Sequence, residues 1–129
     1  MKDFSRYQLP AIIYAILIFI GSALHQVPTP DLGIVWFDKV EHFSEYFVFA
    51  LLTIRALQYT PVGLKGKSLY ILAILLCFFY AGTDEFHQMY VPGRDADVFD
   101  LMADTVGIIT GAAVYLLSRY IMQKRRSAG

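Results

Sequence analysis

Three short blocks of this 129-residue chain combine histidine, carboxylates and cations at spacings that support proton transfer or metal binding. In the first block, Asp38 and Glu45 share one face with His42 at helical spacing. Lys39 and Tyr46 share a second face with it. A carboxylate beside an imidazole raises the imidazole pKa and fixes its tautomer, which suits a general acid or base or a metal ligand. The alternative is a helix entrance at a membrane surface, with Lys39 and Tyr46 as anchors.

The second block, residues 83–88, follows a long uncharged run. Asp84, His87 and Gln88 are i, i+3 and i+4 neighbours, and Glu85 points off their stripe by about a quarter turn. The second histidine of an H-E-x-x-H motif is absent, so the block is not a metalloprotease signature. A carboxylate and histidine pair is compatible with zinc or with proton transfer. An interhelical clamp between Asp84 or Glu85 and a basic residue is an equally good interpretation.

The third block is a predicted turn followed by a helix start. Pro92 and Gly93 predict the turn, and Asp95 or Asp97 can cap the next helix at its positive dipole end. Capping accounts for one acid of the series only. Arg94, between the turn and these acids, has the planar donor geometry that binds phosphate bidentately.

The acids of the third block continue as a helical stripe. Asp97, Asp100 and Asp104 are i, i+3 and i+7 on one face. Gly107 and Gly111 extend this face as a G-x-x-x-G close-packing motif, so we expect it to lie against other helices. Carboxylates that share a face repel one another unless a cation, a metal or hydrogen bonds compensate. We favour a functional polar site here, and treat a divalent metal as an alternative that the sequence does not favour.

The elements that must carry these blocks are membrane helices. The chain is 57% hydrophobic with a mean hydropathy of +0.49, which is too apolar for an ordinary soluble domain. Residues 7–30 and 68–83 contain no charged side chain and can cross a bilayer. The region 39–59 is weaker and needs shelter from lipid, because only residues 46–54 are uncharged. We predict an all-α, polytopic membrane protein, a four-transmembrane-helix bundle with short loops and helices at about residues 7–25, 39–59, 68–89 and 97–120.

The chain shows no internal repeat or domain linker, which predicts a single domain over residues 1–129. A cleavable signal peptide is the competing interpretation of the first helix, because Gly21-Ser22-Ala23 resembles a small-residue cleavage site. The lone cysteine, Cys77, lies in an apolar run and cannot form an intramolecular disulfide, so we interpret it as a core or lipid-facing residue.

The positions of the basic residues predict the orientation. With both termini in the cytoplasm, the side that retains Lys and Arg carries Lys2, Arg6, Arg55, Lys65, Lys67, Arg119, Lys124, Arg125 and Arg126. Only Lys39 and Arg94 then fall on the opposite side. The three blocks with their histidines and carboxylates also fall on that opposite, outer side.

Several function classes are disfavoured. The net charge is zero and the pI is about 6.8, so no basic field exists to attract nucleic acid. No phosphate-binding glycine loop, nucleophile elbow or dinucleotide fingerprint occurs.

Taken together, the three blocks resemble the VanZ-like family. The motif residues are Asp38-Lys39 with His42-Phe43 and Tyr46, then Asp84-Glu85-x-His87-Gln88, then Pro92-Gly93-Arg94 with Asp97, Asp100 and Ala103-Asp104 leading to Gly107. The resemblance covers nearly the whole chain and implies a small bacterial integral membrane protein of the cell envelope. The family's namesake is associated with resistance to the glycopeptide teicoplanin. Family members often carry Asn where this chain has Asp104.

The resemblance and the residues together imply a protein of the bacterial cytoplasmic (inner) membrane. We expect it to recognise or modify an envelope lipid or lipid-linked precursor and to influence glycopeptide antibiotic susceptibility. Enzymatic activity is left open; hydrolysis or transfer at a lipid-linked phosphate is the reaction class that the residues suit best. Candidate catalytic residues are His42, Glu85, His87, Asp97 and Asp100, and candidate substrate-binding residues are Arg94, Lys39, Tyr46 and Gln88. No metal or other cofactor is assigned.

The expected partners are membrane lipids, with a lipid-linked envelope precursor, a glycopeptide or a second copy of the chain as further candidates. One alternative function is a non-catalytic assembly or binding module, in which the polar cluster is a permanent network between helices. Another is a proton-coupled transporter or scramblase, which four short helices could form only as an oligomer.

Overall fold

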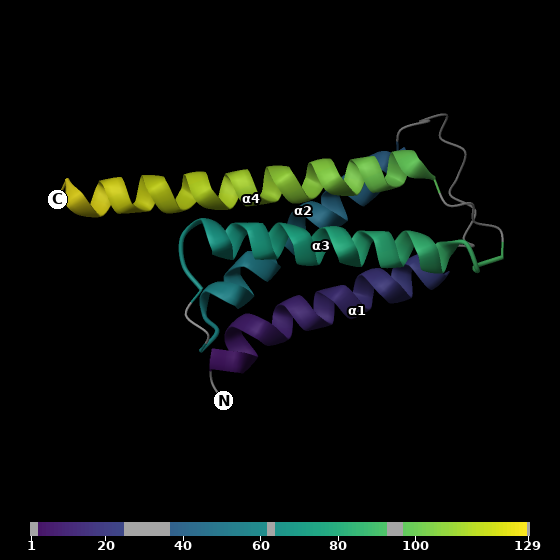
Figure 1. The fold of residues 1–129 in the computed structure, drawn as a ribbon, viewed down its shortest axis with the longest axis horizontal. Helices are drawn as coiled ribbons and strands as arrows, with labels where there is room; N and C mark the ends of the chain where they lie inside the picture. Colours follow the sequence, from purple (N-terminus) through teal and green to yellow (C-terminus); the bar gives the residue numbers. More distant parts are fainter. Residues whose placement is uncertain (1–2, 25–36, 62–63, 93–96, 129) are drawn as a thin grey trace.

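The computed structural model describes residues 3–24, 37–61, 64–92 and 97–128. In chain order these residues form the π-helix η1 (Phe4–Gln8) and the α-helices α1 (Leu9–Leu24), α2 (Phe37–Gln58), α3 (Lys67–Gln88) and α4 (Val98–Ser127). The described part of the chain is therefore all-helical, as predicted (Figure 1). One difference is that α4 continues to Ser127, beyond the predicted end near residue 120. Lysine, arginine and glutamine are good helix formers, so the charged tail extends the helix.

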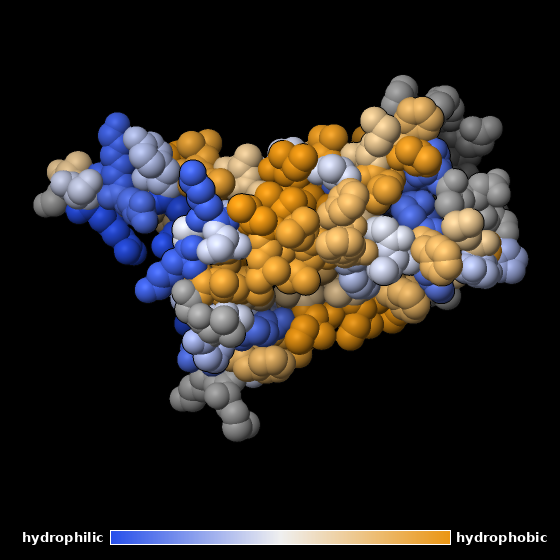
Figure 2. Space-filling view, viewed as in Figure 1, coloured by the Kyte–Doolittle hydropathy of each residue, from blue (hydrophilic) through white to orange (hydrophobic). Residues whose placement is uncertain are grey.

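Three helical segments are long and apolar enough to cross a membrane: Phe4–Ala23, Lys67–Gln88 and Val98–Ser127. The helix α2 is not among them, because charged side chains crowd its first half. Figure 2 shows one face of the bundle, with apolar side chains across its middle and hydrophilic side chains toward both ends. This surface is the one expected of a helical membrane protein.

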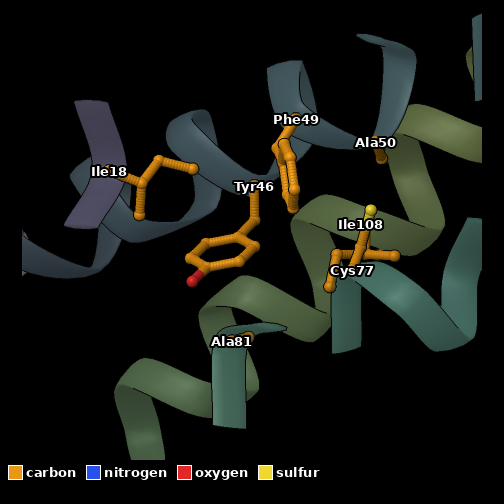
Figure 3. Packing of buried hydrophobic residues seen from close by; sticks show 7 residues of the cluster. All are labelled: Ile18, Tyr46, Phe49, Ala50, Cys77, Ala81 and Ile108. Carbon is orange, nitrogen blue, oxygen red and sulfur yellow. The ribbon is translucent and has the colours of Figure 1, made fainter. Parts of the chain in front are cut away.

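Buried side chains from all four α-helices form the core of the bundle. Its central cluster consists of Ile18, Tyr46, Phe49, Ala50, Cys77, Ala81 and Ile108 (Figure 3). The Cys77 thiol is fully buried, so this residue belongs to the core and does not face lipid.

The helices α2 and α4 approach each other most closely, and two glycines make this approach possible. A Cβ atom on Gly107 would collide with the backbone oxygen of Phe43. A Cβ atom on Gly111 would lie 2.7 Å from the backbone oxygen of Phe47. The predicted close contact at the glycine stripe is confirmed, and its partner is α2. The acidic residues on the same face of α4 are thereby directed at the start of α2.

Candidate functional site

The polar site is built from three helix ends. The start of α2, the end of α3 and the start of α4 meet at the end of the bundle opposite the two chain termini (Figure 1). Asp97 caps α4 by accepting a hydrogen bond of 2.9 Å from the backbone N–H of Phe99, so capping by this acid is confirmed. The alternative cap, Asp95, lies outside the described residues.

Lys39 links α2 to α4 in the outer layer of the site. Its Nζ atom donates hydrogen bonds to Asp97 at 2.7 Å and to Asp38 at 3.2 Å, and it also pairs with Asp100. The Lys39 side chain is 20% exposed and that of Asp97 is 39% exposed, whereas Asp100 is buried. The Lys39 ammonium holds the pKa of Asp97 below its usual range, and the hydrogen bond from Phe99 acts in the same direction. The outer layer therefore reaches solvent through Lys39 and Asp97.

His42 forms the inner layer one turn further along α2. Its Nδ1 atom lies 3.0 Å from Oδ1 of Asp104, and its Nε2 atom lies 3.9 Å from Asp100 and 4.0 Å from Asp38. The exposed fractions of the His42 and Asp104 side chains are 6% and 1%. The imidazole thus connects a buried carboxylate on one side to the Lys39 cluster on the other, which is an arrangement that can move a proton.

Glu85 brings α3 into the inner layer. It is 8% exposed, and neither of its carboxylate oxygens has a hydrogen-bond partner among the described residues. A carboxylate oxygen of Glu85, a ring nitrogen of His42 and a carboxylate oxygen of Asp104 all lie within 4.8 Å of one another. Three helices therefore contribute one potential ligand each to a single group of buried side chains.

Asp84, the neighbour of Glu85, forms a clamp between helices. Its carboxylate accepts hydrogen bonds from Ser22 of α1 at 2.7 Å and from Gln88 at 3.2 Å. The expected clamp used a basic residue, whereas these two donors are a hydroxyl and an amide. Gln88, a candidate substrate-binding residue, is buried, and its side-chain amide donates to Asp84 in this clamp.

Three other candidates lie elsewhere. Tyr46 is fully buried in the core, and its hydroxyl has no hydrogen-bond partner among the described residues (Figure 3). His87 stacks on Phe19 of α1 with ring centroids 4.4 Å apart, and it belongs to neither cluster of potential metal ligands found among the described residues. Arg94 lies outside the described residues.

Two residues of the site were not among the catalytic or substrate-binding candidates drawn from the sequence. Asp104 is the hydrogen-bonding partner of His42, and its place on the acidic stripe was a usable signal. Ser22 contacts Asp84 across 62 positions of the chain, and its only sequence signal, a small-residue triplet, suggested a cleavage site. A pairing at such sequence distance has no local signature.

Comparisons with known proteins show sequence relatives of this chain. A sequence model of the VanZ/LLP1 family matches residues 2–119. An uncharacterized protein of Schizosaccharomyces pombe is 33% identical over 115 residues, which cover 88% of this chain and 64% of that protein. The chain thus spans less than two thirds of this relative's length. No solved structure matches the chain.

Proposed function

This chain belongs to the VanZ/LLP1 family, and from that premise we propose that it recognises or modifies a lipid or lipid-linked precursor of the cell envelope. The observation that carries the proposal is the layering of the polar site. Lys39 and Asp97 are partly exposed at the surface, while His42 and Asp100 are buried directly behind them. A polar headgroup that approaches along the membrane surface meets the outer layer first and the proton-transferring imidazole second.

Recognition of a phosphate headgroup requires cations at the site. Lys39 supplies one, at present shared among three carboxylates. Arg94 precedes Asp97 by three positions in the sequence and remains our candidate for a bidentate phosphate contact. Conversely, the excess of carboxylates suits the ammonium group of a zwitterionic or aminated headgroup.

In the catalytic form of the proposal, the reaction is hydrolysis of a lipid phosphate ester. The oxygen of water forms a bond to phosphorus, and the bond from phosphorus to the lipid oxygen breaks. His42 takes the proton from the attacking water and then gives it to the leaving lipid oxygen, which becomes an alcohol. The hydrogen bond between His42 and Asp104 orients the imidazole for this transfer.

We propose that all four α-helices span the membrane, with both termini in the cytoplasm. The helix α2 has 22 residues, the same number as α3, and seven of its residues are buried by its neighbours. The charged side chains of α2 are half-buried against its neighbours, and Lys39 pairs with carboxylates of α4, which lowers the cost of placing them in a bilayer. A cytoplasm-active reporter should give signal when fused after Gly129 and none when inserted at Thr29; the reverse pattern would contradict the orientation.

The test of the main proposal uses the purified chain in vesicles of phosphatidylethanolamine and phosphatidylglycerol. Native mass spectrometry measures retained lipid, and phosphate release is measured with a polyprenyl monophosphate and with phosphatidate. We expect His42→Ala and Asp100→Asn to lose retention or turnover. Ser44→Ala, an exposed position on the same helix, should behave as the wild type. Equal lipid retention and equal turnover in all four proteins would reject the proposal.

The bacterial inner membrane and an effect on glycopeptide susceptibility are further parts of this proposal. The relative described above comes from a eukaryote, so family membership does not by itself place the chain in bacteria. Expression in a teicoplanin-sensitive bacterium should raise the inhibitory concentration of teicoplanin for the wild type but not for His42→Ala at equal membrane abundance.

A second function, a non-catalytic assembly module, is favoured by one observation. The polar contacts of Lys39 with Asp97 and Asp100, and of His42 with Asp104, all join α2 to α4 and would hold the bundle together without turnover. The exchange of charges in Lys39→Asp with Asp100→Lys separates the two functions. A structural network should tolerate this exchange, whereas a catalytic or binding site should not.

A further inference from the structure

Two groups of potential metal ligands share His42, and they differ in how their charge is balanced. The outer group is Asp38, His42 and Asp100. The ammonium of Lys39 binds Asp38 and Asp100, so the chain supplies the cation for this group. The inner group of His42, Glu85 and Asp104 is not bonded to any Lys or Arg side chain in the described part of the chain.

The unsatisfied carboxylate of Glu85 points to a ligand in the inner group. Glu85 is more than nine-tenths buried, and both of its oxygens are without a hydrogen-bond partner among the described residues. Burial of an ionised carboxylate without compensation is strongly unfavourable. One of these oxygens nevertheless lies within 4.8 Å of potential ligand atoms of His42 and Asp104, which belong to two other helices.

We propose that His42, Glu85 and Asp104 bind a divalent metal ion between α2, α3 and α4. One imidazole nitrogen with two carboxylate oxygens suits Zn²⁺ or Mn²⁺. Mg²⁺ and Ca²⁺ prefer ligand sets made of oxygen atoms alone. Nδ1 is the ring nitrogen that faces Asp104, so the ion would replace the proton shared by Nδ1 and Asp104 and bind through Nδ1. Nε2 then faces Asp100 and Asp38, which are the carboxylate neighbours that typically orient a metal-bound histidine.

Three protein ligands leave at least one coordination position for water or for an oxygen of a bound molecule. The site therefore provides a Lewis acid directly behind the exposed outer layer. The ion also offsets the repulsion between Glu85 and Asp104. Metal binding by these residues does not depend on the proposed lipid, because all three ligands come from the chain itself.

The first test titrates the full chain with metal in the absence of any lipid substrate. The protein is purified in detergent, freed of its affinity tag, stripped with EDTA and titrated with Zn²⁺ and with Mn²⁺ in a calorimeter. We expect the wild type to bind a single ion, and Glu85→Gln and Asp104→Asn to lose affinity by about 100-fold or more. Asp38→Asn, which removes a partner of His42 but no ligand of the ion, should lose clearly less affinity than either variant. Ser44→Ala, at an exposed position of α2, should remain close to the wild type.

Three results would overturn the inference. The wild type binds no ion, in which case Glu85 is buried as a neutral carboxyl group. Glu85→Gln binds as tightly as the wild type, which places the ion elsewhere. Asp38→Asn loses affinity as strongly as Glu85→Gln, which assigns the ion to the outer group.

A second measurement keeps the site testable if Glu85→Gln does not fold. Pulsed electron paramagnetic resonance of the Mn²⁺-loaded protein detects coupling to a directly bound histidine nitrogen. The chain has three histidines, so a His25→Gln, His87→Gln double variant leaves His42 alone. The nitrogen coupling should persist in this variant, and its absence would exclude His42 as a ligand.

Discussion

The contact of α2 with α4 and the contact of α1 with the rest of the bundle are made in different ways. At the first, glycines bring two backbones together, and the polar pairs Lys39–Asp100 and His42–Asp104 join the starts of the two helices. At the second, α1 presents exposed apolar side chains to its surroundings. It is attached by isolated hydrogen bonds, such as Tyr80 to the Ala15 carbonyl at 2.5 Å and Ser22 to Asp84 at 2.7 Å.

The difference matters because lipid solvates apolar side chains as well as a neighbouring helix does. Helices in a membrane therefore associate through close packing and hydrogen bonds. The contact of α2 with α4 uses both over its length, whereas α1 adds only a few hydrogen bonds to apolar contacts such as that of Ile18 with the core. We infer that the geometry of the His42 cluster is set by α2 and α4, and that α1 can be loosened without dispersing it.

The strongest test of this comparison is Gly107→Leu. The new side chain would occupy the place of the Phe43 backbone, which cannot move without displacing α2. We expect loss of the folded protein, or a destabilisation of at least about 3 kcal/mol, the upper part of the range for overpacked cores. Thermal unfolding followed by circular dichroism in detergent measures it. Ala113→Leu, on the exposed face of α4, is the matched control, and equal damage at both positions would contradict the glycine contact.

The next largest effect is expected for Asp104→Ala, which leaves His42 without its buried partner. Loss of a buried hydrogen bond to a charged group costs about 1.5–3 kcal/mol. Asp104→Asn retains an oxygen that can accept the imidazole hydrogen bond, so its loss of unfolding free energy should be clearly smaller. If the two variants unfold at the same temperature, the hydrogen bond does not stabilise the contact.

A smaller effect is expected at the α1 contact. Ser22→Ala removes the hydroxyl that reaches Asp84, and a single hydrogen bond of this kind contributes about 0.6–1 kcal/mol. Gly21→Ala is the control, because a Cβ atom there meets nothing within 4 Å. The Ser22 variant should also leave metal or lipid binding at the His42 cluster unchanged. A change in that binding would show that α1 does help to position the cluster.

The smallest effect is a pH dependence from Asp97. Its pKa is lowered in the folded protein, so its pairing with Lys39 stabilises the fold above the unfolded pKa of about 3.9. The stabilisation is lost as the pH falls through the lowered folded pKa. Asp97→Asn keeps a good helix cap but not the charge. Melting temperatures of the two proteins should differ slightly near neutral pH and converge in acid; a constant difference would show that the cap alone matters.

The parts of the fold that could be predicted from the sequence are those with local signals. Uncharged runs predicted the apolar helices, and the spacing of Gly107 and Gly111 predicted a close contact between helices. The direction of a side chain at a helix end has no such signal. Asp84 and His87 share a helical stripe, yet one reaches Ser22 while the other stacks on Phe19.

The site shows the same limit. The spacing of the acids on α4 indicated a common face, but it could not reveal which carboxylate meets His42. That choice depends on the register of α2 against α4. The register is set by two glycine contacts and cannot be read from either helix separately.

The length of α4 has a consequence for how deeply the whole bundle sits in its membrane. Its 30 residues extend for about 45 Å, whereas the hydrocarbon layer is about 30 Å thick. The last turns, with exposed Lys124, Arg125 and Arg126, therefore lie beyond the acyl chains. Each basic residue near an anionic leaflet is attracted by about 1 kcal/mol. Because α4 is one continuous helix, we expect anionic lipid at that leaflet to change how deeply Asp97 and Asp100, at the other end of the helix, lie in the membrane.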